Sequence, residues 1–400
     1  MNKRVSNSGA MFFCSILVVF LLGEMMVRGF GHFDEDGNFF IHSLRCYPYR
    51  MPFKRLKTNI DHYITSNNSY LIFDPVVGWV PRPSSQSKNK LYFFNKDGLR
   101  TESCESVISR IPRKGVLRIA IYGDSFTLGD DNSFENTWGY YLENNLKERG
   151  IKAEVLNFGV GGYGMDQSFL RWRDGGYDYE PQIVLFGLSL ENMKRNVNLI
   201  RTLYVLGTEI SFFKPRFVFE QDKLKLINVP TPSPDQLVEI LRHLDSWEYL
   251  KYEYWYKRED YQNRPWLKSK LVSFIYSFIK KYNAKMPLAH QEELAKLSLS
   301  IVSMFKESVE SRGKQFYIIY LPDKNDLRLL LKSRKLPNSD FLKEIESKAA
   351  LFNPTTIFLE EIGRLSMERV IPGHYSARAN EIIGDSIADF ILRSSAKYEN

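Results

Sequence analysis

An alternation of apolar segments with helical patterns, starting at Val116, most strongly constrains how this chain folds. Short apolar runs predict buried strands at Val116–Tyr122, Ala153–Phe158, Gln182–Leu188 and Gln315–Leu321. Between and after them, the patterns predict helices at Thr137–Arg149, Gln167–Arg173, Glu292–Arg312, Ser339–Phe352 and Ser376–Leu392, and one short strand at Thr355–Leu359. Strands that alternate with helices favour a parallel sheet covered on both faces. The sequence therefore predicts an α/β fold of three layers, α/β/α.

Two segments interrupt or precede this core, which we expect to span 116–200 and 311–400. Residues 201–310 are predicted to be an insertion, with a hairpin that turns at Gln221-Asp222 and a charged, aromatic helical stretch from Pro234 to about Leu288. Within that stretch, "LVSFIYSFIKKY" has apolar positions at helical spacing, which favours a helix that covers the core over a second membrane contact. Residues 31–115 are predicted to be an extension of short strands, broken by prolines and by an "NKDG" turn.

Residues 1–30 are predicted to be a signal anchor or a signal peptide. Lys3 and Arg4 precede an apolar run from Ala10 to Gly23, which reaches membrane-spanning length only if it includes "EMMVR". No Ala-x-Ala-like cleavage site follows the run, so an uncleaved single-pass anchor is the favoured interpretation. The positive N-terminus predicts that the remainder of the chain lies outside the cytoplasm, periplasmic or extracellular, and secreted if the segment is cleaved.

The net charge of +8 is compatible with an anionic partner, but the basic residues are scattered among nearly as many acids. No RNA-binding motif or zinc-finger spacing occurs, so we expect no nucleic-acid partner; an acidic polymer or an anionic membrane surface explains the charge at least as well. The three cysteines lack the spacing of a zinc site, and we expect no metal and no cofactor. Cys46 and Cys104 are able to pair if their compartment oxidises thiols.

Four short segments place reactive side chains at predicted strand ends or before the last helix. Ser125 follows the first core strand in "GDSFT", Gly162 lies in "NFGVGGYG" after the second, and Asn192 lies in "ENMKRN" after the third. His374 lies in "GHYSARAN", which opens the last helix. In an open parallel sheet these positions converge at the carboxyl ends of the strands. A serine hydroxyl needs a nearby base, and His374 is the best-placed histidine.

The glycine-rich segment also has a rival interpretation. Gly159 to Gly164 fits G-x-G-x-x-G, and Asp178 lies about twenty residues further on, as in a dinucleotide site. This interpretation leaves the serine, asparagine and histidine unexplained, so we do not favour it.

Together, the four segments resemble the blocks of the SGNH/GDSL hydrolase superfamily, over about 116–200 and 310–395. The resemblance implies a flavodoxin-like α/β/α fold, Ser125 as nucleophile and His374 as base. It also implies an oxyanion hole formed by Ser125, Gly162 and Asn192. The flanking "GWVPRP", "NKDGLR" and "KPRFVF" resemble membrane-anchored bacterial members linked to the modification of cell-surface polysaccharides.

The chain departs from the family pattern in front of its histidine. An aspartate is usual two or three residues before it, and these positions hold Pro372 and Ile371. Such an acid fixes the histidine tautomer and stabilises the imidazolium. A backbone carbonyl, Glu368, Glu191 or Asp124 is an alternative partner, although Asp124 is expected mainly to brace its own turn. Met193 follows Asn192, where the family usually has Asp.

The sequence thus predicts an extracytoplasmic esterase or O-acyltransferase that acts through an acyl-serine. Its expected substrate is an acetylated cell-surface or exported carbohydrate, with polysaccharide-assembly proteins as further partners. Hydrolysis and transfer share the first half-reaction and are not distinguished by sequence. The alternative is an inactive protein of the same fold that binds or assembles glycans, motivated by the missing acid at 371–372.

Overall fold

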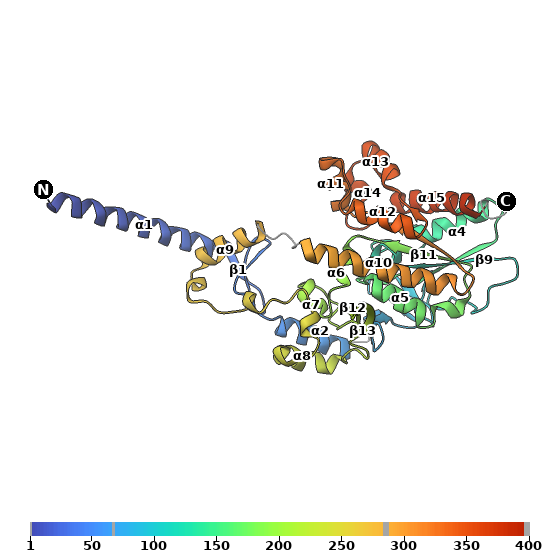
Figure 1. Cartoon of the computed structure of the whole chain (residues 1–400), viewed down its shortest axis with the longest axis horizontal. Coiled ribbons are helices and arrows are strands. Elements are labelled where there is room, and N and C mark those ends of the chain that lie inside the picture. Colours follow the sequence, from blue (N-terminus) through green and yellow to red (C-terminus); the bar gives the residue numbers. More distant parts are fainter. Residues whose placement is uncertain (1, 66–68, 283–287, 396–400) are drawn as a thin grey trace.

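The computed structural model describes residues 2–65, 69–282 and 288–395 (Figure 1). Its central sheet has eight strands in the order β15-β14-β11-β9-β10-β8-β7-β6. The first five are parallel to their neighbours, and the last three continue the sheet in antiparallel fashion. The strands are β6 (Ser85–Gln86), β7 (Phe93–Phe94), β8 (Arg100–Thr101), β9 (Leu117–Tyr122), β10 (Ala153–Asn157), β11 (Ile183–Leu188), β14 (Gln315–Tyr320) and β15 (Leu351–Phe352).

Helices cover both faces of this sheet, as the alternation of strands and helices predicts. One face packs against α5 (Met165–Arg173), α6 (Glu191–Arg195) and α10 (Leu288–Glu310), and the other against α4 (Trp138–Glu148), α13 (Thr355–Arg364) and α15 (Ala377–Ser395) (Figure 1). Successive β9 side chains alternate between the layers: Ala120 and Tyr122 join the first core, and Ile119 and Ile121 the second. This two-sided burial is why the strand is apolar apart from Arg118, which pairs with Glu154.

The remaining elements lie mainly in the N-terminal segment and the insertion. They are α1 (Asn2–Phe30), β1 (Gly31–Phe33), β2 (Phe39–Ile41), β3 (Leu44–Cys46), α2 (Phe53–Thr65), β4 (Leu71–Asp74), β5 (Gly78–Pro81), α3 (Ser125–Leu128), α7 (Arg201–Tyr204), β12 (Arg216–Glu220), β13 (Lys223–Ile227), α8 (Pro234–Arg242), α9 (Lys270–Tyr282), α11 (Lys324–Ser333), α12 (Ser339–Lys348) and α14 (Met367–Val370). Short 3-10 helices connect several of them: Phe134–Asn136, Gly176–Tyr179, Leu244–Ser246, Leu250–Tyr252, Arg258–Asp260 and Pro265–Lys268.

The predicted strand at Thr355–Leu359 is wrong, because this segment begins helix α13. Asn353 accepts a hydrogen bond from the backbone N–H of Thr355 at 3.0 Å, which satisfies a free donor at the helix start. The edge strand is β15, which pairs with β14 and lies where the sequence predicts the end of a helix. Its two residues are too few to show a period of their own.

The insertion contains less helix than the sequence predicts, and the N-terminal extension contains more. The expected helical stretch from Pro234 forms only α8 and α9, joined by 3-10 turns. In the extension, α2 occurs where only strands are expected; it buries Leu56 and Ile60, one turn apart. The hairpin β12–β13 is confirmed, with Gln221 and Asp222 both at positive φ, as a tight hairpin turn requires.

Helix α9 does not cover the core, contrary to expectation. Its buried side chains are Ser273 and Ser277, whereas Ile275, Phe278 and Ile279 are exposed. It packs beside the base of α1 rather than on the central sheet (Figure 1). Its amphipathic pattern is real, but its apolar side faces outward.

Helix α1 contains the one segment of the described chain that is long and apolar enough to cross a membrane by length and composition. This segment, Gly9–Phe30, has 22 residues and a mean hydropathy of 2.3. Its side chains from Gly9 onward are largely exposed. The helix projects away from the body of the molecule (Figure 1).

The cysteines are free thiols, so Cys46 and Cys104 do not pair here. Cys46 is buried at the end of β3, and Cys104 lies against the backbone carbonyl of Ser85 at 3.2 Å.

Candidate active site

Ser125 begins the short helix α3, directly after β9. The turn into it requires glycine at position 123, because a Cβ there would lie 2.1 Å from Thr127 Oγ1 and 2.8 Å from the Gly187 carbonyl oxygen. Asp124 caps the helix by accepting a hydrogen bond from the Phe126 N–H at 3.0 Å. Ser125 itself is 8% exposed, and within the described chain its backbone N–H has no hydrogen-bond acceptor.

Asp124 braces the serine turn, as expected, and does so through side chains of α6 as well as backbone. Its Oδ2 accepts hydrogen bonds from Asn192 Nδ2 at 3.0 Å and from Arg195 Nη1 at 2.9 Å. Asn192 gives its second amide hydrogen to the Tyr163 carbonyl at 3.0 Å, and its Oδ1 accepts from the Ser189 N–H. Both amide hydrogens of Asn192 are therefore engaged within the protein.

His374 is held by an acid that the sequence analysis missed. Its Nδ1 lies 2.8 Å from Oδ2 of Asp131, which follows Ser125 in the loop after α3. The position where an acid is usual, Ile371, is instead fully buried among apolar side chains. The signal in the sequence is the acidic pair Asp130-Asp131, which follows soon after Ser125.

The other acids considered as partners for His374 lie elsewhere. Glu368 pairs with Lys324 and Arg328 on the surface. Glu191 pairs with Lys194 at 2.8 Å on helix α6. Neither pairing places a carboxylate against the imidazole.

Several contacts fix the loop that carries Asp131. The backbone at Asp131 has a φ of 67°, a left-handed conformation that Asp and Asn tolerate better than most residues, and its N–H donates to Tyr92 Oη at 2.9 Å. The buried guanidinium of Arg100 donates to the carbonyls of Leu128, Gly129 and Asn132. Arg100 belongs to the "NKDGLR" segment, which thus supports the loop structurally.

The histidine turn is joined to the serine loop at two further points. Asn132 Nδ2 donates to the Tyr375 carbonyl at 2.8 Å. The Phe126 ring packs edge-on against the His374 ring, with centroids 5.1 Å apart. These contacts bring His374 beside the residue that follows Ser125. In the described structure, however, no hydrogen bond joins Ser125 Oγ to His374; such bonds are often long before substrate binds.

Asp130 places a second carboxylate near the imidazole. Its Oδ2 lies 4.0 Å from His374 Nε2. Burial raises the pKa of Asp130 to about 6, against the opposing positive charges of His374 and Arg100. This carboxyl group is therefore poised to change charge in the weakly acidic range.

The glycine-rich segment packs against the loop that follows Ser125, with Gly159 against Leu128. Gly162 has a φ of +81°, which favours glycine, and within the described chain its N–H has no hydrogen-bond acceptor. Asn157 ties the segment to the serine loop by donating to the Thr127 carbonyl at 2.9 Å. Trp79 of "GWVPRP" donates to the Gly161 carbonyl at 3.1 Å, so this motif too has a structural role.

Arg201 lies against Gly162 and was not singled out from the sequence. A Cβ on Gly162 would lie 3.3 Å from Arg201 Nη2. Arg201 is 8% exposed, and within the described chain its Nε and Nη1 atoms are buried without a hydrogen-bond partner. Burial, with the nearby charge of Arg195, lowers the pKa of Arg201 to about 9. An uncompensated buried cation is costly, so its position next to Gly162 calls for an anion.

A cavity of about 560 Å³ lies beside residues that contact this constellation, although neither Ser125 nor His374 lines it. Its walls include the aromatic side chains of Tyr63, Tyr70, Tyr92 and Phe212. Two of its lining residues touch the site: Tyr92 accepts the Asp131 N–H, and Ile210 lies against Gly162. The cavity is large enough for a small ester or a sugar unit.

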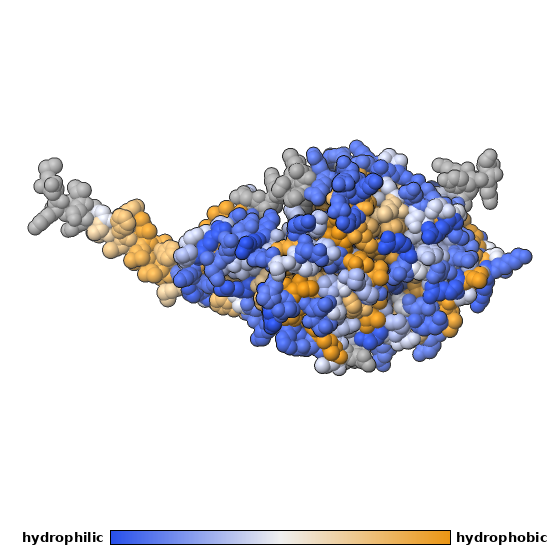
Figure 2. Space-filling model, turned by 60° about the horizontal axis from the view of Figure 1, so that its bottom comes forward, coloured by the Kyte–Doolittle hydropathy of each residue, from blue (hydrophilic) through white to orange (hydrophobic). Residues whose placement is uncertain are grey.

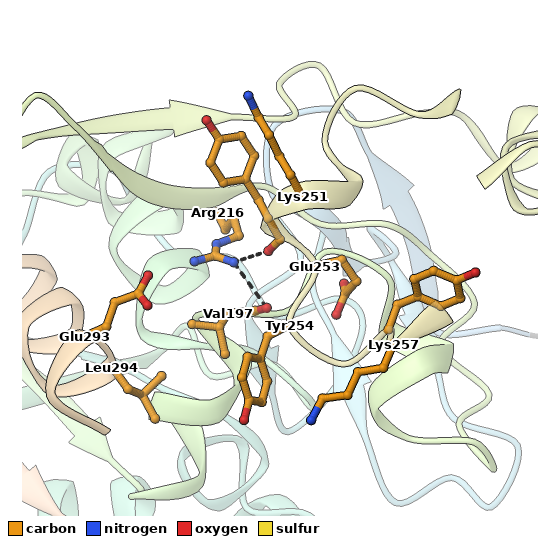
Figure 3. Close-up of a pocket in the computed structure, with 10 residues that line it drawn as sticks. Val197, Arg216, Lys251, Glu253, Tyr254, Lys257, Glu293 and Leu294 are labelled. Atoms are coloured by element: carbon orange, nitrogen blue, oxygen red, sulfur yellow. Dashed lines mark hydrogen bonds between the residues drawn. The ribbon is translucent and has the colours of Figure 1, made fainter. Parts of the chain in front are cut away.

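A second pocket, of about 310 Å³, lies within the insertion (Figure 3). Its two buried charged side chains are held by the protein: Arg216 donates to the carbonyls of Val197 and Tyr252, and Glu253 accepts from the backbone N–H groups of Leu199 and Ile200. Ser125 and His374 do not line it. This pocket therefore reflects the bracing of the insertion against the core.

No family model and no curated protein matches the chain. Among solved structures, it is similar to a putative lipolytic protein of the G-D-S-L family from Desulfitobacterium hafniense DCB-2, with 11% identity, a TM-score of 0.34, and coverage of 68% of this chain and 98% of that one. It is also similar to an acetyl xylan esterase, with 11% identity, a TM-score of 0.36, and coverage of 68% and 99%. It is similar as well to an acetyl xylan esterase from the rumen bacterium Butyrivibrio proteoclasticus, with 11% identity, a TM-score of 0.29, and coverage of 70% of this chain and 64% of that one. With TM-scores below 0.5, these similarities assign no activity on their own.

Proposed function

We propose that this protein is a serine esterase or O-acyltransferase of the SGNH/GDSL type, with Ser125, His374 and Asp131 as its catalytic triad. The observation that carries the proposal is the 2.8 Å contact between Asp131 and His374 beside the serine turn. A carboxylate that accepts the Nδ1 proton leaves Nε2 unprotonated and able to act as a base. Asp131 takes the role that the sequence pattern leaves vacant at Ile371.

In the proposed first half-reaction, His374 Nε2 takes the Ser125 hydroxyl proton as Oγ attacks the ester carbonyl carbon. The carbonyl oxygen becomes an oxyanion, which collapses as the ester C–O bond breaks. The His374 imidazolium then returns the proton to the departing alcohol oxygen, leaving acyl-Ser125. In the second half-reaction, His374 deprotonates water or an acceptor hydroxyl as its oxygen attacks the acyl carbon. The imidazolium then returns the proton to Ser125 Oγ as the bond between the acyl carbon and Oγ breaks.

We assign the oxyanion donors to the Ser125 and Gly162 backbone N–H groups, with the guanidinium of Arg201 as the nearby positive charge. Neither N–H group has a hydrogen-bond acceptor in the described chain, so both are free to donate to an oxyanion. The resemblance assigns a third donor to Asn192, but its amide hydrogens are held by Asp124 and Tyr163. In our proposal Asn192 is thus a positioning residue that holds the serine turn.

The proposed substrate is an acetylated carbohydrate of the cell surface or an exported polysaccharide. The family resemblance suggests this class, and the aromatic lining of the adjoining cavity is compatible with a sugar ring. Hydrolysis and transfer differ only in whether water or a sugar hydroxyl reaches acyl-Ser125, and both remain within the proposal.

We further propose that residues 1–30 stay attached as a membrane anchor, with the catalytic part outside the cytoplasm. The support is structural: Glu24 accepts hydrogen bonds from the backbone N–H groups of Lys270 and Leu271, so cleavage beyond Glu24 would remove the cap of α9. The intact mass of the mature protein tests this directly, since cleavage removes the mass of the leading segment.

Labelling the full chain with a fluorophosphonate tests the catalytic proposal. We expect one adduct on Ser125, lost in Ser125→Ala and strongly reduced in His374→Ala, together with turnover of a small aryl acetate. Folded protein that takes no label and turns over no ester would instead favour the glycan-binding or assembly alternative.

A further inference from the structure

Helix α9 presents an apolar stripe to its surroundings. Ile275, Phe278, Ile279 and Tyr282 are between 47% and 82% exposed and recur at the spacing of one helix face. The opposite face is small and polar: Ser273 donates to the Tyr47 carbonyl, and Ser277 accepts the Tyr47 N–H. A helix that packs through serines and exposes its large apolar residues indicates contact with an apolar environment on its outer side.

This stripe is continuous with the proposed anchor. A Cβ on Gly23 would lie 2.9 Å from Leu271 Cδ2, so the glycine allows α1 and α9 to meet closely. The Glu24 carboxylate accepts hydrogen bonds from Ser269 Oγ and from the first N–H groups of α9. Glu24 is the first charged residue after the apolar run, and its carboxylate is held by Arg28 and by the start of α9. Helix α9 therefore starts beside the part of α1 where charged residues first appear.

A strongly basic pocket lies at the same level. It has a volume of about 530 Å³, and the charged side chains that line it are all cationic: Arg28, Arg50, Arg264, Lys268 and Lys270. Arg28 pairs with Glu24, but Arg50 and Lys268 form no ion pair in the described chain. Burial and the charges of Arg28 and Arg50 lower the pKa of Lys270, as crowding of like charges does.

The surroundings of the pocket match an interfacial position. Trp266, 44% exposed, lies beside the pocket residue Arg264, and Trp is typical of the boundary between lipid and water. Figure 2 shows the apolar surface of α1 leading into a mainly hydrophilic surface at its base. An apolar stripe next to clustered cations is the pattern of a helix that lies in the plane of an anionic membrane.

We propose that α9 lies on the bilayer surface beside the anchor and that the basic pocket binds the phosphate of an anionic phospholipid headgroup. A second copy of this chain is a poorer occupant, because pairing two such pockets would bring like charges together. The lipid surface instead covers the stripe and neutralises the cations at once. The catalytic region is thereby held in a fixed orientation to the membrane.

Hydrogen–deuterium exchange of the full chain in lipid nanodiscs tests this. The probes are discs of phosphatidylcholine alone and discs that also contain phosphatidylglycerol. We expect amides of residues 270–282 to exchange at least about fivefold more slowly in the discs that contain phosphatidylglycerol than in discs of phosphatidylcholine alone. This difference should shrink at high salt. Amides of α4 and α15 should not change.

The double variant Arg50→Gln/Lys268→Gln should lose the difference between the two lipids. A matched double variant on the distant surface, Lys332→Gln/Lys343→Gln, should keep it. Phe278→Ser with Ile275→Ser should raise the exchange of α9 in both kinds of disc.

Three outcomes would overturn the proposal. They are equal exchange of α9 in both lipids, protection in phosphatidylcholine discs on adding inorganic phosphate alone, and protection that appears only when a disc holds two copies of the chain.

Discussion

The Nδ1 atom of His374 and the Oδ2 atom of Asp131 lie 2.8 Å apart, although one residue precedes the last helix and the other follows the first core strand. The pairing is cross-linked locally, since Asn132, next to Asp131, donates to the carbonyl of Tyr375, next to His374. The acid and the base thus belong to two loops that meet at one edge of the sheet.

Replacing Asp131 by Asn should lower kcat for an aryl acetate by about 10²- to 10³-fold, because the imidazole loses the group that fixes its tautomer. We place the loss below the larger values for buried triads, since the Asp131 side chain is 65% exposed and partly screened by water. Asn tolerates the positive φ at this position, so the thermal midpoint should stay close to that of the parent. Steady-state kinetics and thermal unfolding check this, with Glu191→Gln as a control that retains activity. Full activity in Asp131→Asn would remove this residue from the triad.

Replacing Arg201 by Met should lower kcat by about 10²- to 10³-fold with little change in KM, if its charge acts on the oxyanion. The same substitution should leave the free energy of unfolding unchanged or raise it, because it removes a buried charge whose Nε and Nη1 atoms have no hydrogen-bond partner in the described chain.

Lys214 supplies the contrast for Arg201. It is also buried, but it pairs with Asp166 at 2.5 Å. Lys214→Met leaves that carboxylate buried and unpaired, which should cost about 3–5 kcal/mol of unfolding free energy. Denaturant titration and kinetics on the two variants separate these effects; equal destabilisation of both would show that Arg201 is structurally compensated.

Asp130 should make the stability of the protein fall as the pH rises through the weakly acidic range. Burial raises its folded-state pKa to about 6 from 3.8, so the folded state holds a proton that the unfolded state releases between these values. Its stabilising contribution is thus present below about pH 4 and is lost by about pH 6. Relative to the parent, Asp130→Asn should gain up to about 3 kcal/mol of unfolding free energy across that window. Urea unfolding at several pH values measures this difference, and a constant difference would contradict it.

Replacing Arg100 by Met should lower both stability and activity, because the carbonyls of Leu128, Gly129 and Asn132 lose a buried donor. We expect a loss of several kcal/mol, since hydrogen bonds to charged groups are worth about 1.5–3 kcal/mol each. Activity at a temperature where the variant is folded should fall further than that of Arg110→Met, a more exposed arginine. Loss of stability with full activity would show that the loop holds Asp131 without Arg100.

The sequence by itself determined the core strands, because their apolar pattern matches their burial in the sheet. β9, β10, β11 and β14 are mainly apolar because both faces are buried, and their ends and the intervening helices were predicted to within a few residues. The sequence also singled out Ser125, Gly162 and His374, which we propose for the active site, because residues that follow strand ends share one edge of a parallel sheet.

Only the tertiary structure decided which side chains meet. Asp131 reaches His374 because the loop after α3 folds back with a positive φ, and no local pattern records such a contact between residues far apart in the chain. Arg201 lies against Gly162 for the same reason. Helix α9 shows the limit most clearly: its periodicity predicts an amphipathic helix, but which environment its apolar face meets depends on the neighbouring elements. Here the serines pack on Tyr47, and Ile275 and Phe278 face outward beside the anchor.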